Sequence, residues 1–145
     1  VFGMIGGQVV DVNSAGQTVS KDVLNFIYEL KTSALIECAM MIGAVLAGAN
    51  DMEVQKVEQI AKNVGIAFQI QDDILDVTST VEVLGKPVLS DEKNEKTTYV
   101  TLEGIEKARL IVEQLSNEAI LLLQELGGED AFLKNLLTEL IHREK

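Results

Sequence analysis

A cluster of three carboxylates is the feature of the sequence best suited to chemistry. Asp72, Asp73 and Asp76 end the stretch Gly65–Val77, which reads GIAFQIQDDILDV and is otherwise almost wholly apolar. On a helix, the i,i+3 and i,i+4 spacings place all three carboxylates on one face. Gln69 lies three and four residues before the aspartate pair, so its amide shares that face.

Stability alone does not favour this cluster. Like charges at these spacings repel one another, and at the C-terminal end of a helix they also face the negative end of the macrodipole. A bound divalent cation would reverse both penalties, and hard ions such as Mg²⁺ prefer oxygen ligands. The alternative is a solvated acidic helix end, which is common in acidic proteins. The apolar flanks of the cluster favour the metal site.

The pattern around the cluster predicts one long helix from Asp51 to Val77. At 1.5 Å per residue this helix would be ~40 Å long. It begins amphipathic, but past Gly65 its polar face almost disappears. Because a helix that is apolar nearly all round is buried, we expect the aspartates to end a central helix and to face a cavity.

The other segments also read as helices. Ser20 is a predicted N-cap, and the apolar rhythm that follows slips near Lys31–Ser33, which predicts a kink at Lys31–Thr32. The apolar run Ala39–Ala49 is expected to be a buried core helix, and Thr78–Lys96 to be a surface loop. Further helices are predicted over residues 1–10, 104–126 and 129–143. The glycines of the first of these suggest close approach by another backbone: Gly3, Gly6 and Gly7.

Composition indicates a folded all-α domain. The 145 residues are 47% hydrophobic, with one proline and no tryptophan. The formal net charge of −11 argues against nucleic acid as a partner. The most apolar run is well short of the ~20 residues that a membrane span needs.

The cysteine content bears on the cellular compartment, the histidine content on metal binding, and the first residue on whether the chain is complete. Cys38 is the single cysteine, so no internal disulfide forms, which favours a reducing cytoplasm. Cys38 itself is expected to be a small core residue. His142, the single histidine, has no second histidine or cysteine at a ligand spacing. The absence of an initiator methionine indicates that the chain begins inside a larger protein.

Four motifs in order and spacing carry a resemblance to a known family. They are GGQVVD at 6–11, KTSALI at 31–36, FQIQDDILDV at 68–77 and GKPVLSDEKNEKTTYV at 85–100. Together they resemble the C-terminal half of a bacterial-type trans-polyprenyl diphosphate synthase, the family of farnesyl and geranylgeranyl diphosphate synthases. The resemblance covers essentially all of residues 1–145. The chain then corresponds to the C-terminal part of one domain, without the N-terminal half.

The resemblance implies a helical bundle around a central cavity, normally a homodimer. Such enzymes condense isopentenyl diphosphate with an allylic diphosphate, using Mg²⁺ to assist the departure of diphosphate. It implies Asp72, Asp73 and Asp76 as metal ligands. It implies Lys31, Thr32 and Gln69 as catalytic residues that also bind the allylic diphosphate. The remaining residues that it implies are Lys86 and Lys96 at the diphosphate, and Gln8 and Asp11 near the cavity.

Two departures from the family pattern affect this interpretation. Leu89 stands where the family usually has glycine, which weakens the placement of Lys86 and Lys96. The family's first aspartate-rich motif and its basic residues for isopentenyl diphosphate lie upstream and are absent. This chain therefore holds half an active site, and product length, set mainly near that first motif, is not encoded in it.

Two alternative functions remain open at this point. One is a non-catalytic regulatory subunit of a heteromeric prenyl synthase, which could tolerate loss of the first motif. The intact aspartates and lysines argue against this alternative. The other is a class I terpene cyclase, which shares the metal chemistry. GGQVVD and the GK segment favour the synthase family.

Overall fold

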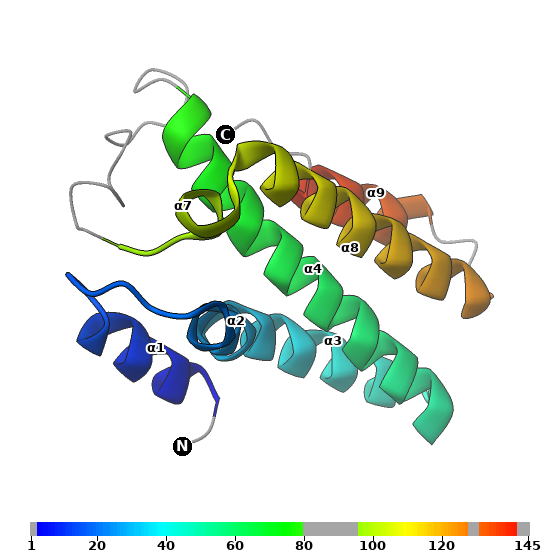
Figure 1. Cartoon of the computed structure of the whole chain (residues 1–145). Coiled ribbons are helices and arrows are strands. Elements are labelled where there is room, and N and C mark those ends of the chain that lie inside the picture. The colour runs from blue at the N-terminus through cyan, green and yellow to red at the C-terminus, as the bar shows by residue number, and fades with distance from the viewer. Residues whose placement is uncertain (1–2, 80–95, 128–130, 142–145) are drawn as a thin grey trace.

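A long central helix organises the fold. The computed structural model describes residues 3–79, 96–127 and 131–141, and the regular elements in these ranges are all helical. Helix α4 (Asp51–Thr78) runs through the middle of the molecule, with α3 (Ala34–Leu46) and α8 (Ile105–Glu125) packed along it (Figure 1). The predicted all-α fold is confirmed.

Local sequence explains why α4 begins where it does and why it is central. The Asn50 side chain accepts hydrogen bonds from the backbone N–H groups of Met52 and Glu53, and the Glu53 carboxylate accepts one from the Asn50 N–H. This capping box satisfies donors that a helix start leaves unpaired. Beyond it, α4 contributes fully buried side chains to the core, which include Ile60, Val64, Ala67 and Ile70. The predicted bounds of this helix are correct to within one residue.

The remaining elements pack against α4, against the helices beside it or against one another. They are α1 (Met4–Asn13), α2 (Lys21–Tyr28), a π-helix at Glu29–Ser33 that joins α2 to α3, α7 (Tyr99–Glu103) and α9 (Ala131–Ile141). Ser20 is the N-cap of α2, as predicted. The short α7 was not predicted. Gly104 separates it from α8 with a φ of +82°, a conformation that glycine adopts without strain.

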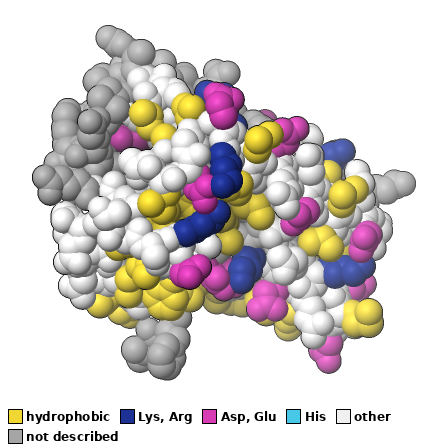
Figure 2. Space-filling model, in the orientation of Figure 1, with side chains coloured by type: hydrophobic (Ala, Val, Ile, Leu, Met, Phe, Trp, Pro, Cys, Tyr) yellow, Lys and Arg dark blue, Asp and Glu magenta, His cyan; other side chains and the backbone are white. Residues whose placement is uncertain are grey.

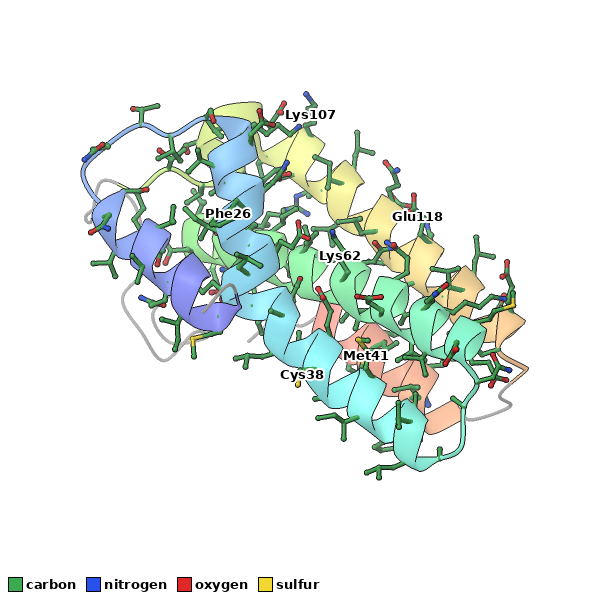
Figure 3. All side chains as sticks on the ribbon, turned by 90° about the horizontal axis from the view of Figure 1, so that it is seen from below. Phe26, Cys38, Met41, Lys62, Lys107 and Glu118 are labelled. Carbon is green, nitrogen blue, oxygen red and sulfur yellow. The ribbon has the colours of Figure 1, made fainter. Side chains whose placement is uncertain are left out.

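The expectation of a buried helix at Ala39–Ala49 was wrong. Helix α3 has no buried residue, and Leu46 is 83% exposed. Cys38, expected in the core, is also exposed (Figure 3). The reason is geometric: α3 packs chiefly against α4 and the π-helix, so its other side stays exposed in the described part of the chain. High apolar content shows that a helix offers surface for packing, not how much of that surface is covered.

The surface carries charges of both signs. Figure 2 shows lysine or arginine and aspartate or glutamate side chains interspersed with hydrophobic ones over the face drawn. Some of them form ion pairs between elements, such as Lys62 with Glu29 at 2.6 Å. Within the described ranges, no helix has the length and apolarity needed to cross a membrane.

Candidate active site

The site begins at an irregular turn of helix. Lys31 and Thr32 lie in the π-helix Glu29–Ser33, between the regular helices α2 and α3. The irregularity predicted at Lys31–Thr32 is therefore confirmed. Single π-turns within α-helices are rare and are frequent at functional sites.

Two glycines let helices α1 and α4 approach this π-turn closely. A Cβ atom added to Gly7 on α1 would lie 2.4 Å from the backbone nitrogen of Lys31. A Cβ atom added to Gly65 on α4 would lie 2.6 Å from the Cα of Ser33. Only glycine permits such close approach. The expectation of backbone approach is thus confirmed at Gly7 and wrong at Gly3, which has nothing within 4 Å of an added Cβ; for Gly6 it stays a prediction.

Lys31 and Lys96 converge on one carboxylate. The Asp11 Oδ2 atom lies 2.6 Å from the Lys31 Nζ and 3.4 Å from the Lys96 Nζ. The side chains of both lysines are about one-third exposed, at 32% and 33%. Asp11 therefore brings together ammonium groups from two segments that are 65 residues apart in the numbering. Two convergent ammonium groups form a site for an anion with several negative oxygens.

Thr32 joins the π-turn to α4. Its hydroxyl donates a hydrogen bond of 2.8 Å to the Gln69 Oε1 atom. Gln69 lies one turn before Asp73 on α4, so this bond fixes the distance between the π-turn and the aspartate-bearing end of that helix.

A small cavity of about 50 Å³ lies where these groups meet. Predicted site residues on its wall are Asp11, Lys31, Gln69, Asp73 and Lys96. The other lining residues are Ser14, Val19, Leu24, Ile27, Tyr28, Thr97 and Thr98. Polar and charged groups from four segments thus share one cavity with apolar side chains from α2.

The three aspartates differ in their surroundings. Asp73 and Asp76 are each 4% exposed, whereas Asp72 is half-buried. The Asp73 Oδ2 atom accepts hydrogen bonds from the Tyr28 hydroxyl and, at 3.1 Å, from the Tyr99 backbone N–H. Asp73 lines the cavity, and the other two are not among its lining residues.

The aspartates suit a hard divalent ion by their chemistry. Their oxygens are the ligand type that Mg²⁺ takes, and Mg²⁺ is usually held by one or two carboxylates together with water and phosphate oxygens. In the described residues, no group of three or more His, Cys, Asp and Glu side chains is arranged to hold a metal ion. The residues present fit part of a coordination set, and Asp72, Asp73 and Asp76 as joint ligands stay a prediction.

Two other predicted residues are not placed in the site. Lys86 falls, with Leu89, outside the described residues, as does most of the predicted surface loop. Gln8 lies on α1 three residues before Asp11 and is not among the cavity's lining residues.

Sequence reasoning missed the two tyrosines of the site. Tyr28 and Tyr99 are buried, at 5% and 4% exposed, and their rings lie 5.6 Å apart between centroids. The Tyr99 hydroxyl donates to the Asn25 side chain, and burial raises the pKa of that phenol. A signal was present, since a buried tyrosine needs a hydrogen-bond partner and each lies three residues from a predicted site lysine.

Comparison with known proteins identifies the family of the chain. The polyprenyl synthetase family matches residues 1–126. The chain belongs to this family. Geranylgeranyl diphosphate synthase of Cyanophora paradoxa is 42% identical over 123 residues, which is 81% of this chain and 41% of that protein. Farnesyl diphosphate synthase of Micrococcus luteus is 36% identical over 143 residues, which is 99% of this chain and 49% of that protein.

A solved member of the family shares the fold. The Helicobacter pylori geranyltransferase, crystallised with magnesium and isoprenyl diphosphate, is 31% identical, with a TM-score of 0.79. The match covers 97% of this chain and 46% of that one. The chain thus spans less than half the length of these family members.

Proposed function

We propose that the whole protein to which this chain belongs is a short-chain trans-prenyltransferase. It condenses isopentenyl diphosphate with an allylic diphosphate in isoprenoid biosynthesis. The observation that carries the proposal is the meeting of Lys31 and Lys96 at Asp11, on a cavity that Gln69 and Asp73 also line. The names of the relatives, which are farnesyl and geranylgeranyl diphosphate synthases, support this substrate class.

The reaction joins two carbon atoms and releases diphosphate and a proton. The allylic C–O bond breaks, and its electron pair leaves with the diphosphate. The double bond of isopentenyl diphosphate supplies the pair for the new C–C bond, and transfer of a proton from the adjacent carbon to the released diphosphate restores an alkene. Negative charge therefore grows on the departing diphosphate, and groups that meet this charge lower the barrier.

Each described site residue has a part in this chemistry. Lys31 and Lys96 supply positive charge to the diphosphate, and Asp11 holds their ammonium groups close together before substrate arrives. Thr32 and Gln69, bonded to each other, present polar groups beside the reacting carbon. Leu24, Ile27 and Val19 supply the apolar part of the cavity wall, beside which the cationic carbon is shielded from water. Lys86 is proposed to act with Lys96, and Gln8 to support Asp11.

We propose Mg²⁺ as the cofactor, held on this chain by Asp72, Asp73 and Asp76. When bound, Mg²⁺ would neutralise charge on the diphosphate oxygens. The carboxylates near the end of α4 supply oxygen ligands, and Asp73 lines the same cavity as Lys31 and Lys96. The crystallised family member that contains magnesium and isoprenyl diphosphate supports this proposal.

The whole protein is further proposed to be a homodimer of the cytoplasm. Exposed apolar side chains on α1 and α3 support association, and among them are Ile5, Val12, Leu35 and Ile42. The exposed thiol of Cys38 suits a reducing compartment. Light scattering on the whole protein measures its mass, and a monomer at working concentration would contradict the proposal.

The decisive experiment is an assay of the whole protein with radiolabelled isopentenyl diphosphate, an allylic diphosphate and Mg²⁺. We expect a Mg²⁺-dependent prenyl diphosphate product, and a fall in kcat/KM of at least about 100-fold for Asp72→Ala, as for loss of a main electrostatic group. Wild-type turnover by Asp72→Ala would contradict the role of this carboxylate. Tight diphosphate binding without turnover by the unmodified protein would instead favour the regulatory subunit.

A further inference from the structure

The middle aspartate of the cluster is held by two neutral donors. The Asp73 carboxylate is 4% exposed, and its Oδ2 atom accepts hydrogen bonds from the Tyr28 hydroxyl and the Tyr99 backbone N–H. A buried carboxylate is tolerated when donors such as these satisfy it. One oxygen atom of Asp73 is therefore already engaged by protein groups on two other elements.

Each of the three residues in this hydrogen-bonded junction lies on a different helix. Tyr28 is the last residue of α2, three residues before Lys31. Tyr99 is the first residue of α7, three residues after Lys96. Asp73 lies on α4, four residues after Gln69. Each partner of the junction is thus three or four residues from a side chain of the proposed diphosphate site.

Further contacts make this a specific junction of three helices. The Tyr28 and Tyr99 rings pack with their centroids 5.6 Å apart. The Tyr99 hydroxyl donates to Asn25 on α2, and the Lys21 Nζ lies 5.6 Å from the centroid of the Tyr99 ring. Helices α2, α4 and α7 therefore meet at the two tyrosines, and Asp73 accepts a hydrogen bond from each of the other two helices.

We infer that Asp73 is a positioning residue, which Tyr28 and the Tyr99 N–H hold in order to set Lys31 and Lys96 at a fixed distance from the aspartate-bearing end of α4. The inference rests on the proposed Mg²⁺–diphosphate site. It refines the proposed set of Mg²⁺ ligands: Asp73, which lines the cavity, fixes the geometry of the site through its hydrogen bonds instead of ligating the ion, and Asp72, which is more exposed than Asp73, remains a ligand. It also assigns a function to Tyr28, which removal of one hydroxyl tests.

The test uses the whole protein, with Mg²⁺ and inorganic pyrophosphate as the probe. The readouts are the Tm without ligand and the pyrophosphate concentration that gives half of the thermal shift. The test variant is Tyr28→Phe, which removes the donor to Asp73 and keeps the ring. The matched control is Tyr99→Phe, which also removes one buried phenol hydroxyl, but one that donates to Asn25 and leaves the N–H donor to Asp73 in place.

Tyr28→Phe is expected to raise the half-saturating pyrophosphate concentration about tenfold, on the scale of a lost hydrogen bond to a charged group. Tyr99→Phe is expected to lower the Tm but to leave half-saturation within about twofold of wild type, since its hydroxyl does not reach the carboxylate. A purely structural role for Tyr28 would lower the Tm and leave half-saturation unchanged, and this result would overturn the inference. An equal rise in both variants would also overturn it.

Two aspartate variants separate positioning from direct ligation. Asp73→Asn keeps a side-chain oxygen that both donors can reach, so most of the pyrophosphate response should remain. Asp72→Asn should lose that response. If Asp73→Asn loses as much as Asp72→Asn, the charge of Asp73 acts on the ligand directly and the inference fails. If the unmodified protein shows no thermal shift with Mg²⁺ and pyrophosphate, the proposed function fails instead, so the two failures are distinguishable.

Discussion

Replacement of Gly7 by alanine tests how the π-turn is positioned. In the structure the new Cβ would lie 2.4 Å from the Lys31 nitrogen, 2.8 Å from the Leu30 carbonyl carbon and 2.9 Å from the Lys31 Cα. All three contacts are backbone atoms, so no rotamer change relieves them. Ordinary van der Waals contact begins near 3.4 Å. Helix α1 and the π-turn must therefore separate by about 1 Å at Lys31.

The expected magnitude follows from two opposing terms. In an open helix position, glycine to alanine stabilises by roughly 0.5–1 kcal/mol. Overpacking of a tight contact costs about 1–3 kcal/mol, and the rigid backbone places this site at the upper end. The net change for Gly7→Ala is then a loss of about 1–2 kcal/mol. At about 2–4 °C per kcal/mol, the scale for proteins of 150 residues or more, that lowers the Tm by roughly 2–8 °C. A displacement of ~1 Å at a positioning group costs about 100-fold in rate.

The assay compares Gly7→Ala with Gly43→Ala in the whole protein. Gly43 lies within α3 and has nothing within 4 Å of an added Cβ, so the same substitution there should raise the Tm slightly. We expect the two variants to move the Tm in opposite directions, and only Gly7→Ala to lower kcat/KM. A Gly7→Ala variant with wild-type Tm and turnover would refute the idea that this contact sets the position of Lys31.

Two further predictions concern single contacts. Thr32→Val removes the hydroxyl that donates to Gln69, so urea unfolding should show a loss of about 1 kcal/mol, with a lower kcat; unchanged stability and turnover would show that this bond does not contribute. Hydrogen bonds from Lys107 and Lys21 lower the pKa of Glu103 from 4.5 to about 2. Because this pKa is depressed, the stabilising contribution is present above about pH 5 and is lost as the pH falls from about 4.5 to about 2. The Tm difference between wild type and Glu103→Gln should follow that course, and a difference that does not change with pH would contradict it.

The sequence predicts most of the fold because its helices carry strong local signals. Helix α4 has a capping residue, an amphipathic first half and a second half that is mostly apolar before the aspartates, and its predicted bounds were correct to within one residue. The kink at Lys31–Thr32 was also predictable, since a π-turn shifts the apolar periodicity by one residue. Helix α7 was missed because five residues are too few to show a period.

Burial was harder to predict than helix position. Helix α3 has the apolar composition of a core helix, yet none of its residues is buried. The periodicity of a segment reports its secondary structure, whereas its exposure depends on which other elements pack against it. Cys38 was placed in the core by the same reasoning and is exposed. Such errors are not correctable from the segment itself.

The sequence predicted part of the site and missed the uncharged groups that donate hydrogen bonds to Asp73. Lys31, Lys96, Asp11 and Gln69 were all singled out, and the structure brings them to one cavity. The hydrogen bonds from the Tyr28 hydroxyl and the Tyr99 backbone N–H to Asp73 were not predicted. A backbone donor has no sequence signal, whereas each tyrosine could have been found from its spacing of three residues to a predicted site lysine. Sequence therefore identifies charged groups that bind a ligand more readily than the uncharged groups that hold them in place.

The arrangement of charge gives the strongest physical argument for a ligand with both signs. At this site the two ammonium groups of Lys31 and Lys96 contact Asp11, and the buried Asp73 accepts hydrogen bonds from the Tyr28 hydroxyl and the Tyr99 N–H. The negative end of the α4 macrodipole adds to the charge of the three aspartates that end this helix. A diphosphate alone would be attracted by the lysines and repelled by the end of α4. A metal ion alone would be repelled by the lysines and attracted by the end of α4. A metal-bound diphosphate would suit both surfaces at once, because the carboxylates would attract its cation and the ammonium groups its oxygens.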